Sequence, residues 1–231
     1  MYETMALSKA ELQAVVLSVQ VAFYCSLIAL PLALTVGYVM ARHHFWGKSV
    51  IESIIHLPLV MPPVTTGYLL LLILGSNGMI GGWFYDVFHI KLAFTFQASV
   101  IASLVVSFPL FVRSVRTAIE MVDPGLEEAS RILGAGRFKT FFRITVPLSL
   151  PGIISGTILC FARSLGEFGA TITFAGNIPG HTQTLPLAIY SYMQVPDGEH
   201  ATFRLVLVSV SIALVAMVLS ERMIKGMQKE K

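Results

Sequence analysis

Long apolar runs separated by short polar segments dominate the chain. A helix needs about 20 predominantly apolar residues to cross the roughly 30 Å hydrocarbon core of a bilayer. The strict alternation that marks a transmembrane barrel strand is absent. The pattern therefore predicts an all-α fold, a polytopic transmembrane helix bundle of about five spanning helices. The predicted spans are residues 15–41, 54–74, 92–112, 148–165 with an extension toward Phe174, and 203–219.

One further apolar stretch, residues 185–193, is too short to cross the bilayer and predicts a re-entrant or interfacial piece. A sixth full span is not expected. Neither a linker nor an internal repeat divides the chain, so residues 1–231 are predicted to form a single membrane domain.

Prolines interrupt the second predicted span at Pro58, Pro62 and Pro63. A proline bends a helix and frees carbonyl groups that protein or cavity water must satisfy. A broken helix beside a transport pathway and a static kink are both consistent with this pattern.

Composition agrees with a membrane location. Hydrophobic residues make up 55% of the chain and charged residues 13%, against about 25% charged residues in soluble domains. The net charge of +3 is modest and unevenly placed, so it reports orientation in the membrane. We expect contact with membrane lipids and no nucleic-acid partner.

Lysine and arginine indicate which side of the membrane each loop occupies. Residues 164–203 contain neither, whereas the loop between the third and fourth spans is rich in both. Positively charged loops stay inside the cell, which predicts an external N-terminus and a cytoplasmic C-terminus. The basic residues of this loop and its flanks are Arg113, Arg116, Arg131, Arg137, Lys139 and Arg143.

The same loop contains signals for a short cytoplasmic helix. Asp123 and Pro124 are typical of a helix start, and Glu127 and Glu128 fall where the helix dipole favours acids. Gly134 and Gly136 can supply a left-handed stop. The predicted helix has about ten residues and is about 15 Å long.

Such a helix is too short to be stable alone and needs a partner surface. Helical spacing places Leu126, Ala129 and Leu133 on one face and pairs Glu127 with Arg131 on another. The partner could be the membrane domain of the same chain or a separate protein.

Residues 123–147 resemble a known family motif. The order Glu128, Ala129, Ser130, Gly134, Ile144 and Pro147 is similar to the "EAA…G…I-x-x-P" loop of permease subunits in binding-protein-dependent ABC importers. Ser130 replaces the second alanine, and Val146 stands where leucine is common. The resemblance implies a coupling helix that docks in a cleft of a cytoplasmic ATPase. The implied coupling residues are Glu127, Glu128, Ala129, Ser130, Gly134 and Pro147.

Two longer stretches, residues 56–71 and 161–190, resemble the molybdate-type permeases. Sulfate permeases share an "EFGA"-like core but are usually longer, so they are the alternative. The resemblance implies a homodimeric permease in the bacterial inner membrane. Its implied partners are a cytoplasmic ATPase dimer and a periplasmic or lipid-anchored oxyanion-binding protein. An ion-coupled transporter without an ATPase and a membrane-embedded enzyme are other function classes.

The second stretch contains the candidate pathway or gate residues. Glu167 follows Arg163 by one helical turn near the outer end of the fourth span, where an ionisable group must face protein or water. Ser164 and Thr171 offer hydroxyl donors to a passing oxyanion. An ion pair that only tethers helices is the alternative interpretation, and close packing is the simpler reason for the glycines nearby.

Catalytic and cofactor motifs are not predicted. The "GKS" at residues 47–49 lacks the glycine that a phosphate-binding loop requires five positions earlier, where Arg42 stands. The histidines show no metal-ligand spacing, and no nucleophile elbow occurs. We expect no metal, no cofactor and no catalytic site in this chain, whose energy would come from a separate ATPase.

Overall fold

The computed structural model describes residues 7–229, and every regular element among them is a helix, as predicted. The elements are α1 (Lys9–Arg42), α2 (Lys48–Val60), α3 (Pro63–Leu74), α4 (Met79–Phe88), α5 (Phe96–Glu120), α6 (Pro124–Ile132), α7 (Arg137–Thr140), a π-helical turn η1 (Phe141–Thr145), α8 (Val146–Leu165), α9 (Gly169–Phe174), α10 (Leu185–Met193) and α11 (Glu199–Lys229).

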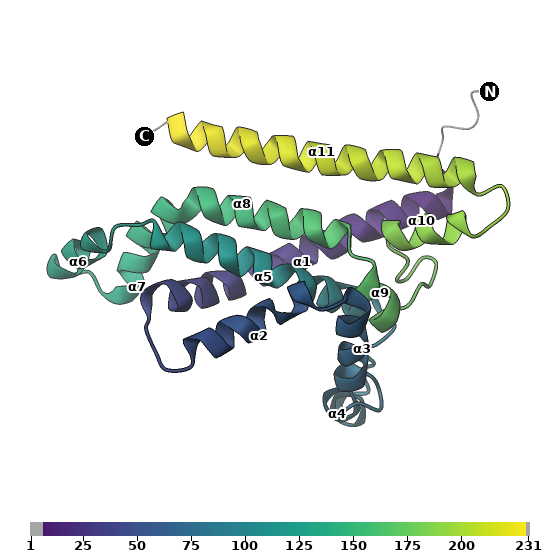
Figure 1. Ribbon diagram of the computed structural model, residues 1–231, viewed down its shortest axis with the longest axis horizontal. Coiled ribbons are helices and arrows are strands. Elements are labelled where there is room, and N and C mark those ends of the chain that lie inside the picture. Colours follow the sequence, from purple (N-terminus) through teal and green to yellow (C-terminus); the bar gives the residue numbers. More distant parts are fainter. Residues whose placement is uncertain (1–6, 230–231) are drawn as a thin grey trace.

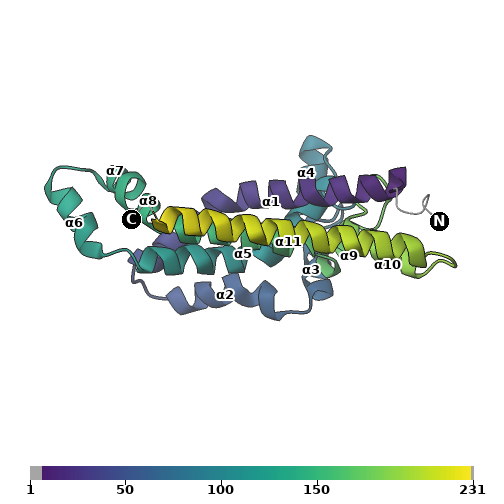
Figure 2. The same ribbon diagram turned by 90° about the horizontal axis from the view of Figure 1, so that it is seen from above.

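The centre of the bundle is α5, which packs against α1 and α8 (Figures 1 and 2). Its inward face is fully buried at Phe111, Val115 and Ile119, and these residues join Cys25 of α1 and Cys160 of α8 in one core cluster. Lipid tails are as apolar as these side chains, so close van der Waals packing must hold the helices together.

Small residues permit this packing. A methyl group added at Gly152 of α8 would overlap the side chain of Ala118 on α5. Close approach therefore explains Gly152. The short helix α9 meets α3 in the same way, because a Cβ at Gly169 would lie 2.6 Å from that of Pro63.

The predicted spans are largely confirmed. Within the described residues, four helical stretches are long and apolar enough to cross a membrane, and a fifth is available if the α2 and α3 pair forms one span. The four are Lys9–Arg42, Phe96–Glu120, Arg137–Leu165 and Glu199–Met223.

Several boundaries differ from the prediction. The first span begins at Lys9 and not at residue 15, and the fourth begins at Arg137 and not at residue 148. The third span extends to Glu120 and not to residue 112, because Arg116 forms ion pairs with Glu52 at 2.6 Å and Glu120 at 2.7 Å that keep these polar turns helical. The second predicted span, residues 54–74, is not one straight helix. Helices α2 and α3 meet at 114°, with the break just before Pro63. The proline bend was predicted, but helix α4 was not.

The outer part of the fourth span is also broken. The extension toward Phe174 is interrupted between Leu165 and Gly169, and α9 is a separate helix. Residues 185–193 form the short helix α10, as expected for a segment that does not span.

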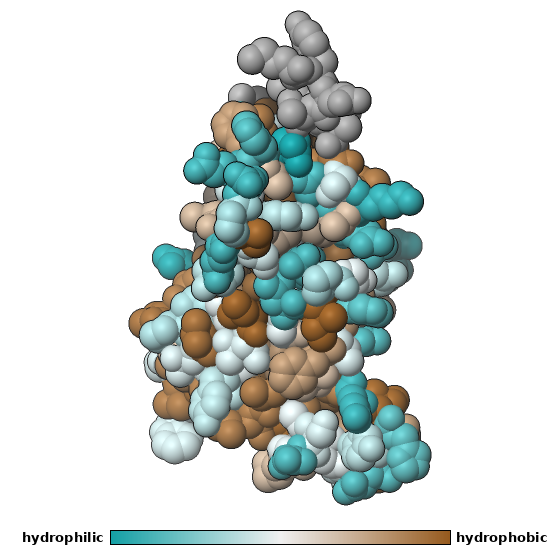
Figure 3. Space-filling model, turned by 90° about the vertical axis from the view of Figure 1, so that its right-hand side faces the viewer, coloured by the Kyte–Doolittle hydropathy of each residue, from teal (hydrophilic) through white to brown (hydrophobic). Residues whose placement is uncertain are grey.

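Seen from the α10 end, hydrophilic side chains spread over the upper and middle part of the surface (Figure 3).

The α5 and α8 contact yields a stability prediction. Gly152→Ala should force the two helices apart, and overpacking of this kind costs about 1–3 kcal/mol. We expect a lower melting temperature of the detergent-solubilised protein, with recovery in the double variant Gly152→Ala, Ala118→Gly. Gly136→Ala is the matched control, because nothing lies within 4 Å of a Cβ at that position. Equal melting temperatures for Gly152→Ala and Gly136→Ala would contradict the packing account.

Candidate functional site

The cytoplasmic segment predicted at residues 123–147 is a capped helix followed by a second, longer one. The Asp123 carboxylate accepts a hydrogen bond from the Gly125 N–H at 2.8 Å, and Pro124 occupies the first turn of α6. The helix runs from Pro124 to Ile132, close to the ten residues expected. It lies at the end of the bundle opposite α10 (Figure 1).

Gly134 ends the helix in a left-handed conformation, with φ of +86°. The Ala135 N–H donates to the Ser130 carbonyl at 3.1 Å and the Gly134 N–H donates to the Arg131 carbonyl at 3.0 Å. This pair of hydrogen bonds is the Schellman stop, which a residue in the left-handed region completes. Gly136 does not contribute to the stop: its φ is −64°, and it begins α7.

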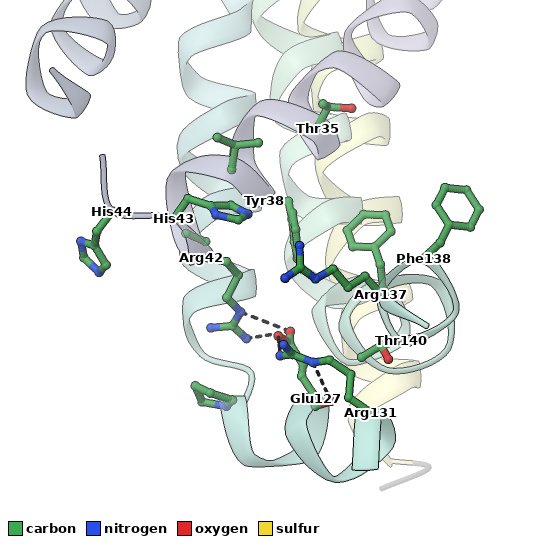
Figure 4. A pocket seen from close by; sticks show the side chains of 14 residues that line it. Thr35, Tyr38, Arg42, His43, His44, Glu127, Arg131, Arg137, Phe138 and Thr140 are labelled. Atoms are coloured by element: carbon green, nitrogen blue, oxygen red, sulfur yellow. Dashed lines mark hydrogen bonds and ion pairs between the residues drawn. The ribbon is translucent and has the colours of Figure 1, made fainter. Parts of the chain in front are cut away.

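Glu127 is buried at the base of α6, with 3% of its side chain exposed. Its carboxylate accepts hydrogen bonds from Arg42 at 3.0 and 3.2 Å (Figure 4). It also accepts one from the Thr145 hydroxyl at 2.7 Å. Arg42 also donates to the Val122 carbonyl at 2.8 Å. One carboxylate therefore joins α6 to the end of α1 and to the turn that leads into α8.

The predicted partner of Glu127 is secondary. Arg131 approaches the carboxylate only to 3.9 Å, although its Nε donates to the Glu127 carbonyl at 3.2 Å. Arg42 lies 85 residues away in sequence, so helical spacing could not identify it. The available signal was its position at the end of the first span that is predicted to be cytoplasmic.

A cavity of about 650 Å³ lies between this joint and the end of α1 (Figure 4). Its lining combines aromatic and basic side chains, so its character is cationic apart from the paired Glu127. Among its lining residues are Tyr38, His43, Arg137 and Phe138.

The opposite side of α6 is free and apolar. Leu126, Ala129 and Leu133 line one groove of about 410 Å³ together with Ser130 and Gly134, which confirms that they share a face. Leu133 is 87% exposed, and Ile132 and Phe138 beside it are exposed as well. Apolar side chains this exposed outside the hydrocarbon are typical of a surface that binds another protein.

The remaining predicted coupling residues differ in their surroundings. Glu128 is exposed with no partner among the described residues, and the Ser130 hydroxyl lies 3.2 Å from that of Thr140. Pro147 is exposed in the first turn of α8. It follows the π-helical turn Phe141–Thr145, whose wider winding accommodates a residue that lacks an N–H.

The candidate gate residues lie at the other end of the bundle, at the break between α8 and α9. Arg163 and Glu167 form an ion pair at 2.7 Å, with only 2% of Glu167 exposed. The Glu167 carboxylate also accepts a hydrogen bond from the Ala170 N–H at 2.9 Å. The pair thus holds α8 and α9 on either side of the break.

Hydroxyl groups near this break lack partners. The buried side-chain oxygens of Ser164 and Thr171 make no hydrogen bond, and neither does that of Thr66 on α3, the helix that packs against α9. Buried polar groups are normally satisfied, so these oxygens are exceptions that call for an explanation.

Comparison with known proteins identifies relatives along nearly the whole chain. Residues 33–229 match the family model described as "Binding-protein-dependent transport system inner membrane component". The molybdenum transport system permease protein ModB of Haemophilus influenzae is 50% identical over 95% of this chain and 96% of its own length. The ModB of Escherichia coli K12 is 51% identical over 94% and 95%.

A solved structure shares the fold. The inward-facing MetNI methionine ABC transporter matches with a TM-score of 0.72 over 96% of this chain and 99% of that chain, at 15% identity.

The Glu127 joint yields a testable consequence. Glu127→Gln leaves Arg42 without its countercharge, and breaking a buried pair of this kind costs about 2–5 kcal/mol. We expect faster hydrogen exchange at the backbone amides of α6, measured by mass spectrometry. The matched control is Glu128→Gln, the same change one residue along at an exposed position. Equal exchange in the two variants would show that the carboxylate does not hold α6 in place.

Proposed function

The chain belongs to the family of binding-protein-dependent transport system inner membrane components, and we propose that it is the permease subunit of an ATP-driven importer of molybdate. The observation that carries the substrate assignment is the 50% identity to a molybdenum permease over almost the full length of both chains. Tungstate is the closest chemical analogue, and sulfate is the alternative substrate.

The proposed mechanism has two copies of the chain enclosing an oxyanion pathway. A binding protein delivers the anion from outside, and two cytoplasmic ATPases bind the α6 segments. The exposed apolar side chains of α6 support this role, because they offer a docking surface where the chain itself provides no cover. The buried Glu127 joint would pass motion of α6 to α1 and α8.

The proposed topology places the N-terminus outside and the C-terminus in the cytoplasm. In its support, α1 begins at the α10 end of the bundle, and α11 ends on the opposite side, the side on which α6 lies (Figure 1). The Arg163 and Glu167 pair then lies on the outer side, where the binding protein would release the anion.

ATPase activity of the reconstituted complex tests this function. The permease, its ATPase and its binding protein would be placed in liposomes with molybdate, tungstate or sulfate. Stimulation of ATP hydrolysis by the molybdate-loaded binding protein is expected. Stimulation by sulfate alone would contradict the substrate assignment. Molybdate uptake that does not require the ATPase would contradict the importer class.

Gly134→Val should uncouple transport. Valine is strained at a φ of +86°, so α6 would lose its stop and its docking face would be re-aimed. We expect near-normal abundance in the membrane with uptake reduced at least tenfold, and with ATPase either detached or hydrolysing unproductively. Gly136→Val is the control, because that position also has open space but a φ of −64°. Normal uptake by Gly134→Val would exclude a coupling role for this helix stop.

Glu167→Gln should impair uptake more than assembly. The amide can still accept the Ala170 hydrogen bond but leaves Arg163 without a countercharge. We expect molybdate uptake to fall about tenfold while dimer and ATPase remain bound, as measured by uptake assay and co-purification. Glu199→Gln, an exposed position at the start of α11, is the control. Wild-type uptake would remove Glu167 from the gate, and loss of assembly would assign it to the structure of the helix break.

A further inference from the structure

Among the arginines on the long helices α1, α5, α8 and α11, two have no countercharge within the described residues: Arg113 of α5 and Arg222 near the exposed end of α11. Four others are paired with carboxylates: Arg42 with Glu127, Arg116 with Glu52 and Glu120, Arg163 with Glu167, and Arg204 with Glu11. Arg113 of α5 makes neither an ion pair nor a hydrogen bond within residues 7–229, and its side chain is exposed.

Its position makes this unusual. Arg113 lies seven residues before the end of α5, about 10 Å along the helix axis from Glu120. An arginine at this depth faces water or protein, because exposure to lipid is costly. The surface that it lines should therefore be hydrated.

Arg113 lines two cavities: a groove of about 680 Å³ between α5 and α8, and a smaller cavity of about 240 Å³ beside Glu52 and His56. The larger groove is the one that has a second wall from α8. Thr117 and Ser155 line it with hydroxyls that have no partner in the described part of the chain. Ser114 and Ser149 line it too, but they donate to backbone carbonyls across the contact, at 3.0 and 3.5 Å.

The other side of α8 differs. The groove of about 380 Å³ between α1, α8 and α11 is lined almost entirely by apolar side chains such as Leu27, Ile158 and Leu219. That face suits lipid tails or packed helices. Both grooves include hydroxyl residues and apolar side chains, but of the two only the α5 and α8 groove has a cation in its lining.

The chemistry of the α5 and α8 groove suits an oxyanion in transit. A guanidinium can donate two parallel hydrogen bonds to an oxyanion, and free hydroxyls can donate more. A single cation per chain gives attraction without tight capture, which conduction requires.

The walls of the groove also connect directly to the coupling segment. Helix α5 ends at Glu120, just before α6 begins at Pro124, and α8 begins at Val146 after η1. The groove reaches Met121, next to the Asp123 cap. A movement of α6 would therefore act on both walls.

We propose that the groove between α5 and α8 is the cytoplasmic part of the oxyanion route and that Arg113 is its anion-attracting residue. This inference rests on the proposed importer function. It adds a second polar region to the pathway, at the end of the bundle opposite Glu167.

Thiol labelling tests whether the groove contains water. The native Cys25 and Cys160 are fully buried, so their background should be small. Thr117→Cys and Ser155→Cys, in the reconstituted complex, should react with a membrane-impermeant charged methanethiosulfonate at least tenfold faster than Leu214→Cys on the apolar surface of α11. Labelling no faster than that of Leu214→Cys would overturn the proposal.

Uptake tests the role of the cation. Arg113→Gln should reduce molybdate uptake at least tenfold with the complex intact, and Arg113→Lys should retain part of it. Arg222→Gln, on the exposed end of α11, is the matched control. Uptake by Arg113→Gln equal to that of the control would overturn the proposal. It would indicate that Arg113 binds lipid headgroups instead of the transported anion. If the wild-type complex itself imports no molybdate, the proposed function fails, while the labelling still tests the water-filled groove.

Discussion

The buried contact of Glu127 with Arg42 and Thr145 is the interaction on which the α6 end of the molecule depends. A nine-residue helix cannot hold its own conformation in water, so α6 needs an anchor. A charge with 3% exposure is stable only when it is paired and hydrogen-bonded. The two partners therefore fix α6 against the end of α1 and against the turn that leads into α8.

The two faces of α6 have different surroundings. The buried face holds the helix to the bundle, and the opposite face leaves Leu126 and Leu133 for a partner. A force applied to the outer face reaches α1 through Arg42 and α8 through Thr145. Close packing at Gly152 then carries it to α5, the other wall of the groove that contains Arg113.

Local signals in the sequence were sufficient for much of this structure. Apolar run length predicted the spanning helices, prolines predicted the bend before Pro63, and Asp123 with Gly134 predicted both ends of α6. Long-range pairing was not predictable in this way. Helical spacing suggested Arg131 for Glu127, whereas the closer partner comes from another helix. The ion pairs of Arg116 likewise extend α5 beyond its apolar run, and no apolar periodicity records them.

The number of molybdate ions imported per ATP hydrolysed, compared between wild type and Glu127→Gln in the reconstituted complex, tests the central claim most directly. If the buried carboxylate transmits motion from the ATPase to the membrane helices, the variant should still bind the ATPase and hydrolyse ATP. Its import per ATP should fall at least tenfold, while Glu199→Gln, at an exposed position at the start of α11, keeps the wild-type ratio. An unchanged ratio in Glu127→Gln, with transport at the wild-type rate, would contradict the claim that this joint couples α6 to the pathway.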